Sequence, residues 1–241
     1  MERDQQRRVG RPSENVLSRE LIVETALELL DEFGPDGFGM KDVAQRLGVR
    51  PSALYNHVTN KEDVFRGVRE ATALRISVDS FSTHPWQDAL KIWARSYRDA
   101  FAKHPPTVAL LAVMPFQHDS EVFASYEQIV SVLHHEGWQR SEALNILVAL
   151  ESFILGSALD AAAAPDMMSP GTRTDIPHFT AAYSDRQDLV TEHRASPADQ
   201  AFESGLNLFV LGLQAQQDAR NRHTSSALHP MGSSQNHAHP G

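Results

Sequence analysis

The chain has 241 residues, 41% of them apolar, and a formal net charge of −9. This length allows one or two compact units with a sizeable core, and the composition is that of a globular rather than a disordered protein. The absence of cysteine excludes a disulfide scaffold and a cysteine-ligated zinc site.

The N-terminal segment is polar and basic. Residues 1–17 contain no apolar secretory core, so we expect a flexible basic arm on a cytoplasmic protein. A first helix is predicted directly afterwards, because Ser18 can cap it and Glu20 suits the positive end of its dipole. Gly34–Pro35 ends an apolar stripe formed by Leu21, Ile22, Ala26, Leu29, Leu30 and Phe33.

Residues 40–57 have the pattern of a helix-turn-helix. Apolar residues at helical spacing lead to Gly48, which can adopt the left-handed conformation that ends a first short helix. Val49 and Leu54 are predicted to fill the angle between the two helices. The residues left exposed are of types that suit a DNA groove: Arg50, Ser52, Ala53, Tyr55, Asn56 and His57.

The negative net charge does not oppose DNA binding, because the positive charges are clustered. Residues 7–19 hold four arginines against one glutamate, and residues 38–61 hold four lysines and arginines against one aspartate. Most of the acidic excess lies beyond residue 61. Binding to phosphates depends on local charge, so these two basic segments are expected to face DNA.

Helices are also predicted along the rest of the chain. Asn60 caps a fourth helix that runs to about Val78, with Asp63 closing a capping-box-like loop. After a break at residues 80–85, apolar residues recur at helical spacing, with a short apolar segment inserted over residues 108–114. The predicted helices cover residues 86–101, 122–133, 141–164 and 198–217.

Residues 141–164 are apolar on nearly every face, which predicts burial on all sides. Asn145, Glu151 and Asp160 interrupt this run, so we expect no membrane span. Residues 165–196 are predicted to form a long loop and residues 218–241 a disordered tail. The predicted fold is all-α, with a three-helix head joined by a linking helix to a larger helical bundle.

Residues 18–70 resemble the N-terminal domain of TetR-family transcriptional regulators. The resemblance depends on the apolar first helix, the Val-Ala-x-x-Leu-Gly-Val turn of residues 43–49, and Leu54-Tyr55-x-His57 followed by Asn60-Lys61. Residues 136–138, 153–156 and 202–206 are similar to landmarks of the tetracycline-repressor branch. The resemblance implies an effector-binding and dimerisation domain over residues 85–217, a DNA-binding domain over residues 18–64, and a homodimer formed by the last two long helices.

The resemblance also implies DNA contacts. Tyr55 is expected to reach a phosphate, although it could instead be half-buried and pack against the head. His57 is expected to lie near the backbone and Lys61 to contact phosphate, while Lys41 is expected at a phosphate or the groove edge. The residues at the start and on the exposed face of the recognition helix are expected to contact DNA bases or the DNA backbone. They are Arg50, Pro51, Ser52, Ala53 and Asn56. Each of them could instead be exposed to solvent without contacting DNA.

The basic arm forms a second candidate contact. Arg8 and Arg11, beside Gly10 and Pro12, resemble the core of hooks that follow the narrow minor groove of A·T-rich DNA. The alternative is an ordinary charged terminus.

An effector pocket, mostly apolar with a few polar groups, is expected within the larger bundle. Its expected lining residues are His104, Leu111, Met114, Phe116, Phe153 and Asp160. Each of them could instead be an ordinary core residue. The tetracycline repressor holds its drug–magnesium complex partly through a histidine and a glutamate. These positions fall near Ala112, which cannot bind metal, and near Asp160, which argues against a magnesium–tetracycline effector. Glu151 and Asp160 could face this pocket or a partner across a dimer axis.

No metal or cofactor is expected. His134 and His135 are adjacent and therefore point to different helix faces, and the remaining histidines mostly stand alone or lie in the tail. Gly34–Gly37 is a turn and not a phosphate loop, and no catalytic triad signature is present, so the protein is not expected to be an enzyme.

The function predicted by these features is that of a homodimeric repressor, which binds a palindromic DNA operator and is released by an unidentified small molecule. One alternative is an activator or a ligand-independent regulator of the same fold. Another is an enzyme or ligand carrier with an added DNA-binding head.

Overall fold

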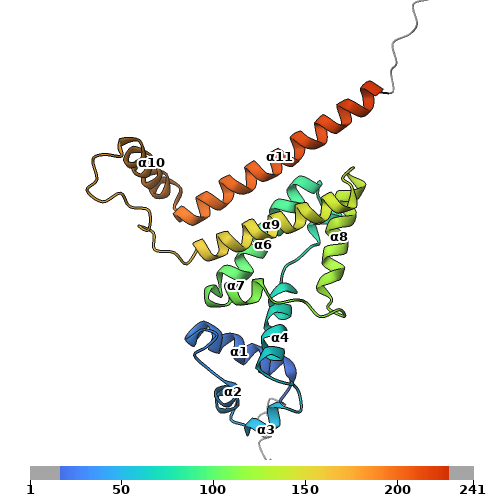
Figure 1. The fold of residues 1–241 in the computed structure, drawn as a ribbon, viewed down its shortest axis with the longest axis vertical. Helices are drawn as coiled ribbons and strands as arrows, with labels where there is room; N and C mark the ends of the chain where they lie inside the picture. The colour runs from blue at the N-terminus through green and yellow to red at the C-terminus, as the bar shows by residue number, and fades with distance from the viewer. Residues whose placement is uncertain (1–16, 228–241) are drawn as a thin grey trace, which may run out of the picture.

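The computed structural model describes residues 17–227, and over this range the chain forms eleven α-helices and no strand. The predicted all-α class is confirmed. Figure 1 shows a small head at one end of the molecule, joined by a linking helix to a larger body. The arm arginines Arg8 and Arg11, and the last fourteen residues of the predicted tail, residues 228–241, lie outside the described residues.

The head contains α1 (Arg19–Phe33), α2 (Met40–Arg46) and α3 (Pro51–Leu54). The predicted caps of α1 are confirmed: the Ser18 hydroxyl accepts a hydrogen bond from the Leu21 amide at 3.2 Å, and Gly34 ends the helix with a φ of 72°. The interior of the head is formed by fully buried apolar side chains from all three helices, including Ile22, Val43 and Leu54.

Helix α4 (Lys61–Ala73) joins the head to the body and packs across α1. The two backbones approach closely at Gly67, where a Cβ atom would lie 2.6 Å from Cγ2 of Val23. The helix ends five residues before the predicted Val78. The buried Ile76 turns the chain inward there, and the short helix α5 (Ser80–Thr83), expected as a break, packs on α6.

The body is built around α6 (Trp86–Ala102) and α9 (Arg140–Asp160), which pack extensively against each other. Helices α7 (Pro105–Ala112) and α8 (Val122–His135) pack against α9 as well. The ring of Trp86 meets that of Trp138 edge to face at a centroid distance of 4.8 Å. Three of these helices, α6, α8 and α9, were predicted approximately from their apolar periodicity, whereas α7 was expected only as a short apolar segment.

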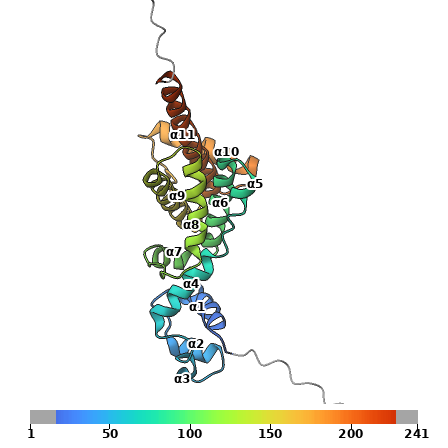
Figure 2. The same ribbon diagram turned by 90° about the vertical axis from the view of Figure 1, so that its right-hand side faces the viewer.

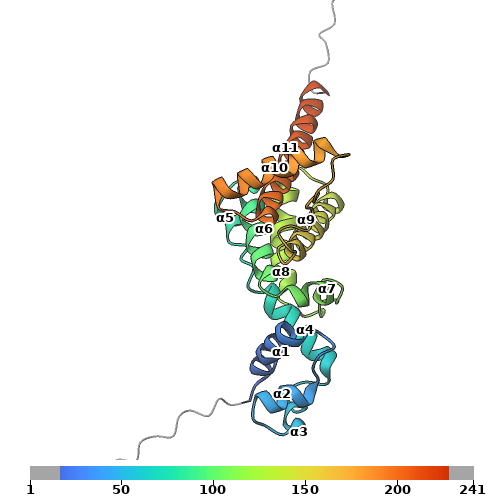
Figure 3. The ribbon, with the colours of Figure 1, turned by 90° about the vertical axis from the view of Figure 1, so that its left-hand side faces the viewer.

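The predicted loop over residues 165–196 is wrong, because residues 177–193 form α10 (Pro177–His193), which packs against α11 (Figure 3). Helix α10 has almost no apolar face, so the periodicity gave no signal, although Pro177 stands in the first turn, where proline suits a helix. The Arg186 guanidinium donates to the Pro197 carbonyl at 2.6 Å and anchors α10 to the start of α11.

Helix α11 (Pro197–Ala227) continues ten residues beyond the predicted end at Gln217, so the expected disorder of residues 218–227 is also wrong. These residues are polar, and a tertiary contact holds the extension. The Arg220 guanidinium donates to both carboxylate oxygens of Glu142 at 2.7 and 2.9 Å, and Gln217 donates to the Glu136 carbonyl at 2.7 Å.

Helix α9 is not buried on all sides as predicted. Leu144, Val148 and Leu159 are 51%, 52% and 45% exposed on the face that points away from the body. Within residues 17–227, α9 is the one helix that is long and apolar enough to cross a membrane. Core helices of soluble proteins also meet this criterion of length and composition. Its other face packs against α6, α7 and α8.

Candidate nucleic-acid interface and interior polar cluster

The turn between α2 and α3 has the geometry that the sequence predicts. Gly48 adopts a φ of 68°, and the Val49 amide then donates to the Ala44 carbonyl at 2.9 Å. Pro51 occupies the first turn of α3. Leu54 is fully buried and anchors α3 to the head, which leaves the other side of this short helix in solvent.

The predicted DNA-contacting residues are mostly exposed on one end of the molecule. Tyr55 is 53% exposed. Figure 2 shows that α2 and α3 lie at the end of the molecule opposite α11. Nothing in the described part of the chain covers this surface. The other exposed members of the set are Lys41, Arg50, Pro51, Ser52, Asn56 and His57, and Ala53 is half-buried.

Lys61 differs from its neighbours because its side chain is turned into the head. Its ammonium group donates to the carbonyl oxygens of Pro35 and Phe38, both at 2.6 Å. It also lies over the Phe38 and Phe65 rings, at 4.7 and 5.1 Å from their centroids. An ammonium group has three donors, so one remains for a phosphate. Lys61 therefore ties the α1–α2 connection to α4, and its contact with DNA stays a prediction.

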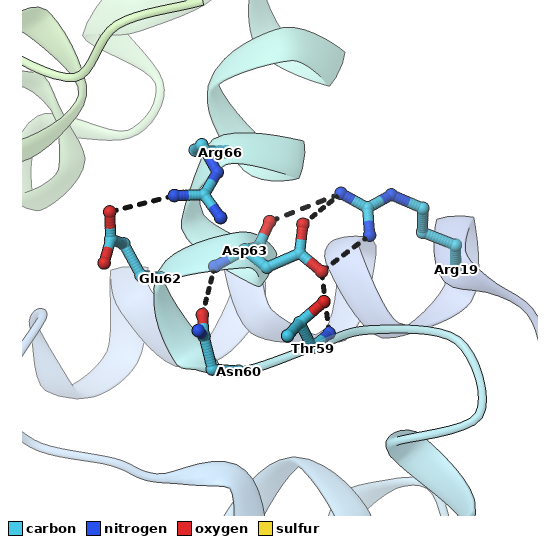
Figure 4. A network of polar contacts seen from close by, with 6 residues as sticks. All are labelled: Arg19, Thr59, Asn60, Glu62, Asp63 and Arg66. Atoms are coloured by element: carbon cyan, nitrogen blue, oxygen red, sulfur yellow. Dashed lines mark hydrogen bonds and ion pairs between the residues drawn. The ribbon is translucent and has the colours of Figure 1, made fainter. Parts of the chain in front are cut away.

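A buried carboxylate fixes the start of α4 (Figure 4). The Asp63 carboxylate accepts hydrogen bonds from the Arg19 guanidinium at 2.8 and 3.1 Å and from the Thr59 amide at 2.8 Å. The Asn60 side chain caps the helix by accepting from the Asp63 amide at 2.8 Å, as predicted. The capping-box prediction is wrong in one detail, because Asp63 reaches Thr59 and not the Asn60 amide.

Arg19 is the partner that sequence reasoning missed, since 44 residues separate it from Asp63. The hydrogen bonds from Arg19 and Thr59 lower the pKa of Asp63 to about 2. The first turns of α1 and α4 are held together by this charge-assisted pair, which sets the position of the α3 segment between them.

His104 was expected in an interior pocket, but it lies instead between the body and the head. It precedes α7, and its Nδ1 atom lies 2.6 Å from a carboxylate oxygen of Asp31 in α1. The reason is tertiary: the end of α1 packs against α7, so the start of α7 faces the head. His104 therefore links the head to the body.

The other predicted pocket residues are distributed over separate places, so they do not form one pocket. Leu111 is fully buried core, and Met114 and Phe116 are half-buried in the connection between α7 and α8. Phe153 of α9 stacks on Phe202 of α11 at a centroid distance of 5.5 Å. Asp160 lines a cavity of about 400 Å³ between the end of α9, α10 and the start of α11.

The structure instead assembles an interior polar cluster, formed by Arg69 of α4, Tyr97 of α6, Tyr126 of α8 and Glu151 of α9. The Tyr126 hydroxyl donates to the Glu151 carboxylate at 2.6 Å. Burial raises the pKa of Glu151 and of both tyrosines, and burial lowers the pKa of Arg69. Glu151 thus faces inward, whereas Asp160 lies at the cavity near α10.

The only sequence signal for this cluster was a carboxylate within an otherwise apolar run, since a buried carboxylate requires polar partners. The partners of this carboxylate come from three other helices and could not be identified from spacing. Within residues 17–227 no group of three or more histidine, aspartate or glutamate residues is arranged to hold a metal ion.

Comparison with known families matches both parts of the chain. Residues 22–68 match the family described as "Bacterial regulatory proteins, tetR family". Residues 82–217 match the family described as "Tetracyclin repressor-like, C-terminal domain".

Individual relatives agree with these matches. An HTH-type transcriptional regulator of Saccharopolyspora erythraea is 27% identical over 83% of this chain and 86% of its own length. The tetracycline repressor protein class E of Escherichia coli is 28% identical over 86% of this chain and 95% of its own length. Among solved structures, TetR from Acinetobacter baumannii AYE aligns with a TM-score of 0.64 and 25% identity, covering 83% of this chain and 98% of that one.

Proposed function

Because this chain belongs to the TetR family of bacterial transcriptional regulators, with a tetracycline repressor-like C-terminal domain, we propose that it is a repressor that binds a palindromic operator and is released by a small molecule. Members of this family are regulators and not enzymes. The idea of a catalyst or carrier with an added head is therefore set aside. A cytoplasmic location is part of the proposal.

The observation that carries the DNA-binding proposal is the uncovered α3 surface. Its polar and basic side chains surround a helix that Leu54 anchors to a rigid head. Arg50 has the donors for a bidentate contact with guanine, and Tyr55 has a hydroxyl for a phosphate. Two such heads, spaced by one helical turn of DNA (about 34–36 Å), would enter successive major grooves.

The homodimer is supported by apolar side chains that the single chain leaves in solvent. Leu144 and Val148 on α9, and Leu208 and Leu211 on α11, are 51–70% exposed. These helices lie side by side on the outside of the body (Figure 1). A second copy of the chain would cover both faces in a four-helix interface, which removes the apolar area from water.

The effector would act by a population shift. Release of DNA requires that the effector binds more tightly to the conformation whose head spacing does not fit the operator. Helix α4 is suited to transmit this preference, since it contacts α1 in the head and both α6 and α7 in the body. Ala112 at the expected metal-binding position argues that the effector is not a magnesium–tetracycline complex.

A footprinting experiment tests the proposal. Purified wild-type protein is incubated with the DNA upstream of its own and neighbouring genes, and protection of a symmetric sequence is expected. Reporter expression in a deletion strain then distinguishes a repressor from an activator, the remaining alternative. Absence of any protected sequence at micromolar protein would contradict the proposal.

A further inference from the structure

The interior polar cluster brings an acidic and a basic side chain near each other without pairing them. Glu151 is held by the Tyr126 hydroxyl at 2.6 Å, and burial disfavours its charged form. Arg69 is near enough for Glu151 to act on it electrostatically, yet no ion pair or hydrogen bond between them is formed. A half-buried guanidinium without a carboxylate partner stabilises the fold little, because taking a charge out of water is costly unless the charge is paired.

Arg69 rests on an aromatic ring and not on a carboxylate. The centre of its guanidinium lies 3.7 Å from the centroid of the Phe116 ring. Within residues 17–227 Arg69 has no ion pair, and burial lowers its pKa, which means that its positive charge is poorly compensated. A planar guanidinium in a partly dry site gains most from a planar anion that accepts two parallel hydrogen bonds.

The surroundings of Arg69 are aromatic. The rings of Phe116, Phe123 and Tyr126 contact one another edge to face at centroid distances of 6.1–6.5 Å. A small void of about 10 Å³ lies on the other side of Tyr126, bounded by side chains that include Trp93 and Tyr97. It has room for one water molecule and is not lined by Arg69 or Glu151, so an effector has to displace Phe116 to reach Arg69.

The connection that closes the site is the irregular segment over residues 113–121, between α7 and α8. Val113 is 81% exposed, and most of the segment has no buried side chain. Phe116 covers Arg69 from this segment. Because few buried contacts hold the connection, its displacement costs less free energy than opening the packed helices would.

We propose that the effector binds between Arg69, Tyr126 and Glu151, and that it is a planar aromatic molecule carrying an acidic group. The acidic group pairs with the Arg69 guanidinium, and the rings take the place of Phe116 within the aromatic cluster. This inference rests on the proposed function, since it names the chemical class of the effector.

The charges decide between ligand classes. An aromatic amine would bring a second positive charge against Arg69, and a neutral phenol would leave Arg69 without a partner. An acid compensates the charge of Arg69, while Glu151, whose raised pKa favours its neutral form, offers little repulsion. Since Arg69 belongs to α4, the same contact would act directly on the helix that leads to the head.

The test uses three naphthalene probes that each carry one polar substituent at the same ring position: 1-naphthoate, 1-naphthol and 1-naphthylmethylamine. Isothermal titration calorimetry with the full-length protein is expected to show binding at least about tenfold tighter for the acid than for either other probe, the effect of one added charge-assisted pair. Arg69→Gln should remove this preference and leave the weak binding of 1-naphthol unchanged. Arg66→Gln is the matched control, because Arg66 lies on the same helix but pairs with Glu62 on the surface.

The preference of the wild-type protein is measured without any variant, so a folding defect in Arg69→Gln does not remove the test. Equal affinity for the three probes, no binding of the acid at millimolar concentration, or a full acid preference in Arg69→Gln would each overturn the inference. In those cases operator protection by the same wild-type sample leaves the proposed function standing. If wild-type protein protects no operator, the proposed function is contradicted, whatever the three probes show.

Discussion

The guanidinium of Arg19 donates two hydrogen bonds to the carboxylate of Asp63, at 2.8 and 3.1 Å, and thereby joins the first turn of α1 to the first turn of α4. Thr59 donates to the same carboxylate from the end of the α3 segment. One carboxylate on α4 therefore contacts both of the other segments that frame the recognition helix (Figure 4).

Asp63→Asn should lower the free energy of unfolding by about 1 kcal/mol at pH 7, because the charged acceptor is lost. The pKa of Asp63 is lowered to about 2 in the folded state. The contribution of the carboxylate is therefore complete above about pH 4, near the pKa of the unfolded chain, and is lost as the pH falls toward 2. Urea unfolding of both proteins between pH 2 and 7 measures this, and most of the difference should be gone at pH 2. Glu62→Gln on the exposed side of α4 is the control, and an equal effect there would remove the special role of Asp63.

Gly67→Ala should destabilise the head by about 1–3 kcal/mol, since the new Cβ would lie 2.6 Å from Val23 Cγ2 and push α1 and α4 apart. Thermal unfolding of the variant measures the loss. Val23→Ala in the same chain removes the opposing methyl groups, so the double variant should be less unstable than the sum of the two single changes. Strict additivity would contradict the proposed clash.

Tyr55→Phe should weaken operator binding to a similar extent for all sequences tested, because a hydroxyl–phosphate contact does not read bases. Arg50→Ala should instead relax the preference at particular base pairs, by about 1–3 kcal/mol per position. Binding to a set of single-base operator variants measures both. Tyr183→Phe on α10 is the control for loss of a hydroxyl, and wild-type behaviour of both head variants would reject this surface as the DNA interface.

Lys61→Ala should affect both stability and DNA binding. The Pro35 and Phe38 carbonyls lose their common donor, so the free energy of unfolding should fall by about 1–3 kcal/mol. If the remaining donor contacts phosphate, the salt dependence of DNA binding should also become shallower by about one unit of slope. Urea unfolding and binding at several salt concentrations separate the two roles. An unchanged salt slope with reduced stability would leave Lys61 a structural residue only.

Leu208→Glu combined with Leu211→Glu should convert a dimer into a monomer, because the charges would enter the proposed interface and lose their hydration. Sedimentation velocity at micromolar concentration measures the change in mass. Val113→Glu is the control, since Val113 is an exposed apolar residue of the body outside that surface. A wild-type protein that is already monomeric would reject the homodimer.

The sequence determined the head almost completely, because its structure depends on local chemistry. Ser18, Gly48 and Pro51 act through neighbouring backbone atoms, so a cap, a turn and a helix start could be read from residue type and spacing. The exposed face of α3 followed from the burial of Leu54. Apolar periodicity likewise predicted α6, α8, α9 and most of α11, whereas α5, α7 and α10 were not predicted as helices.

The tertiary structure decided which residues meet across the chain. Arg19 with Asp63, Asp31 with His104, and Tyr126 with Glu151 are separated by 25 to 73 residues, and polar spacing carries no information over such distances. Helix α10 was missed because its faces are nearly equal in polarity, so only its packing against α11 distinguishes it from a loop. The residue types predicted a DNA-binding head, but the arrangement of four helices was needed to bring Arg69 near a half-buried carboxylate and an aromatic cluster.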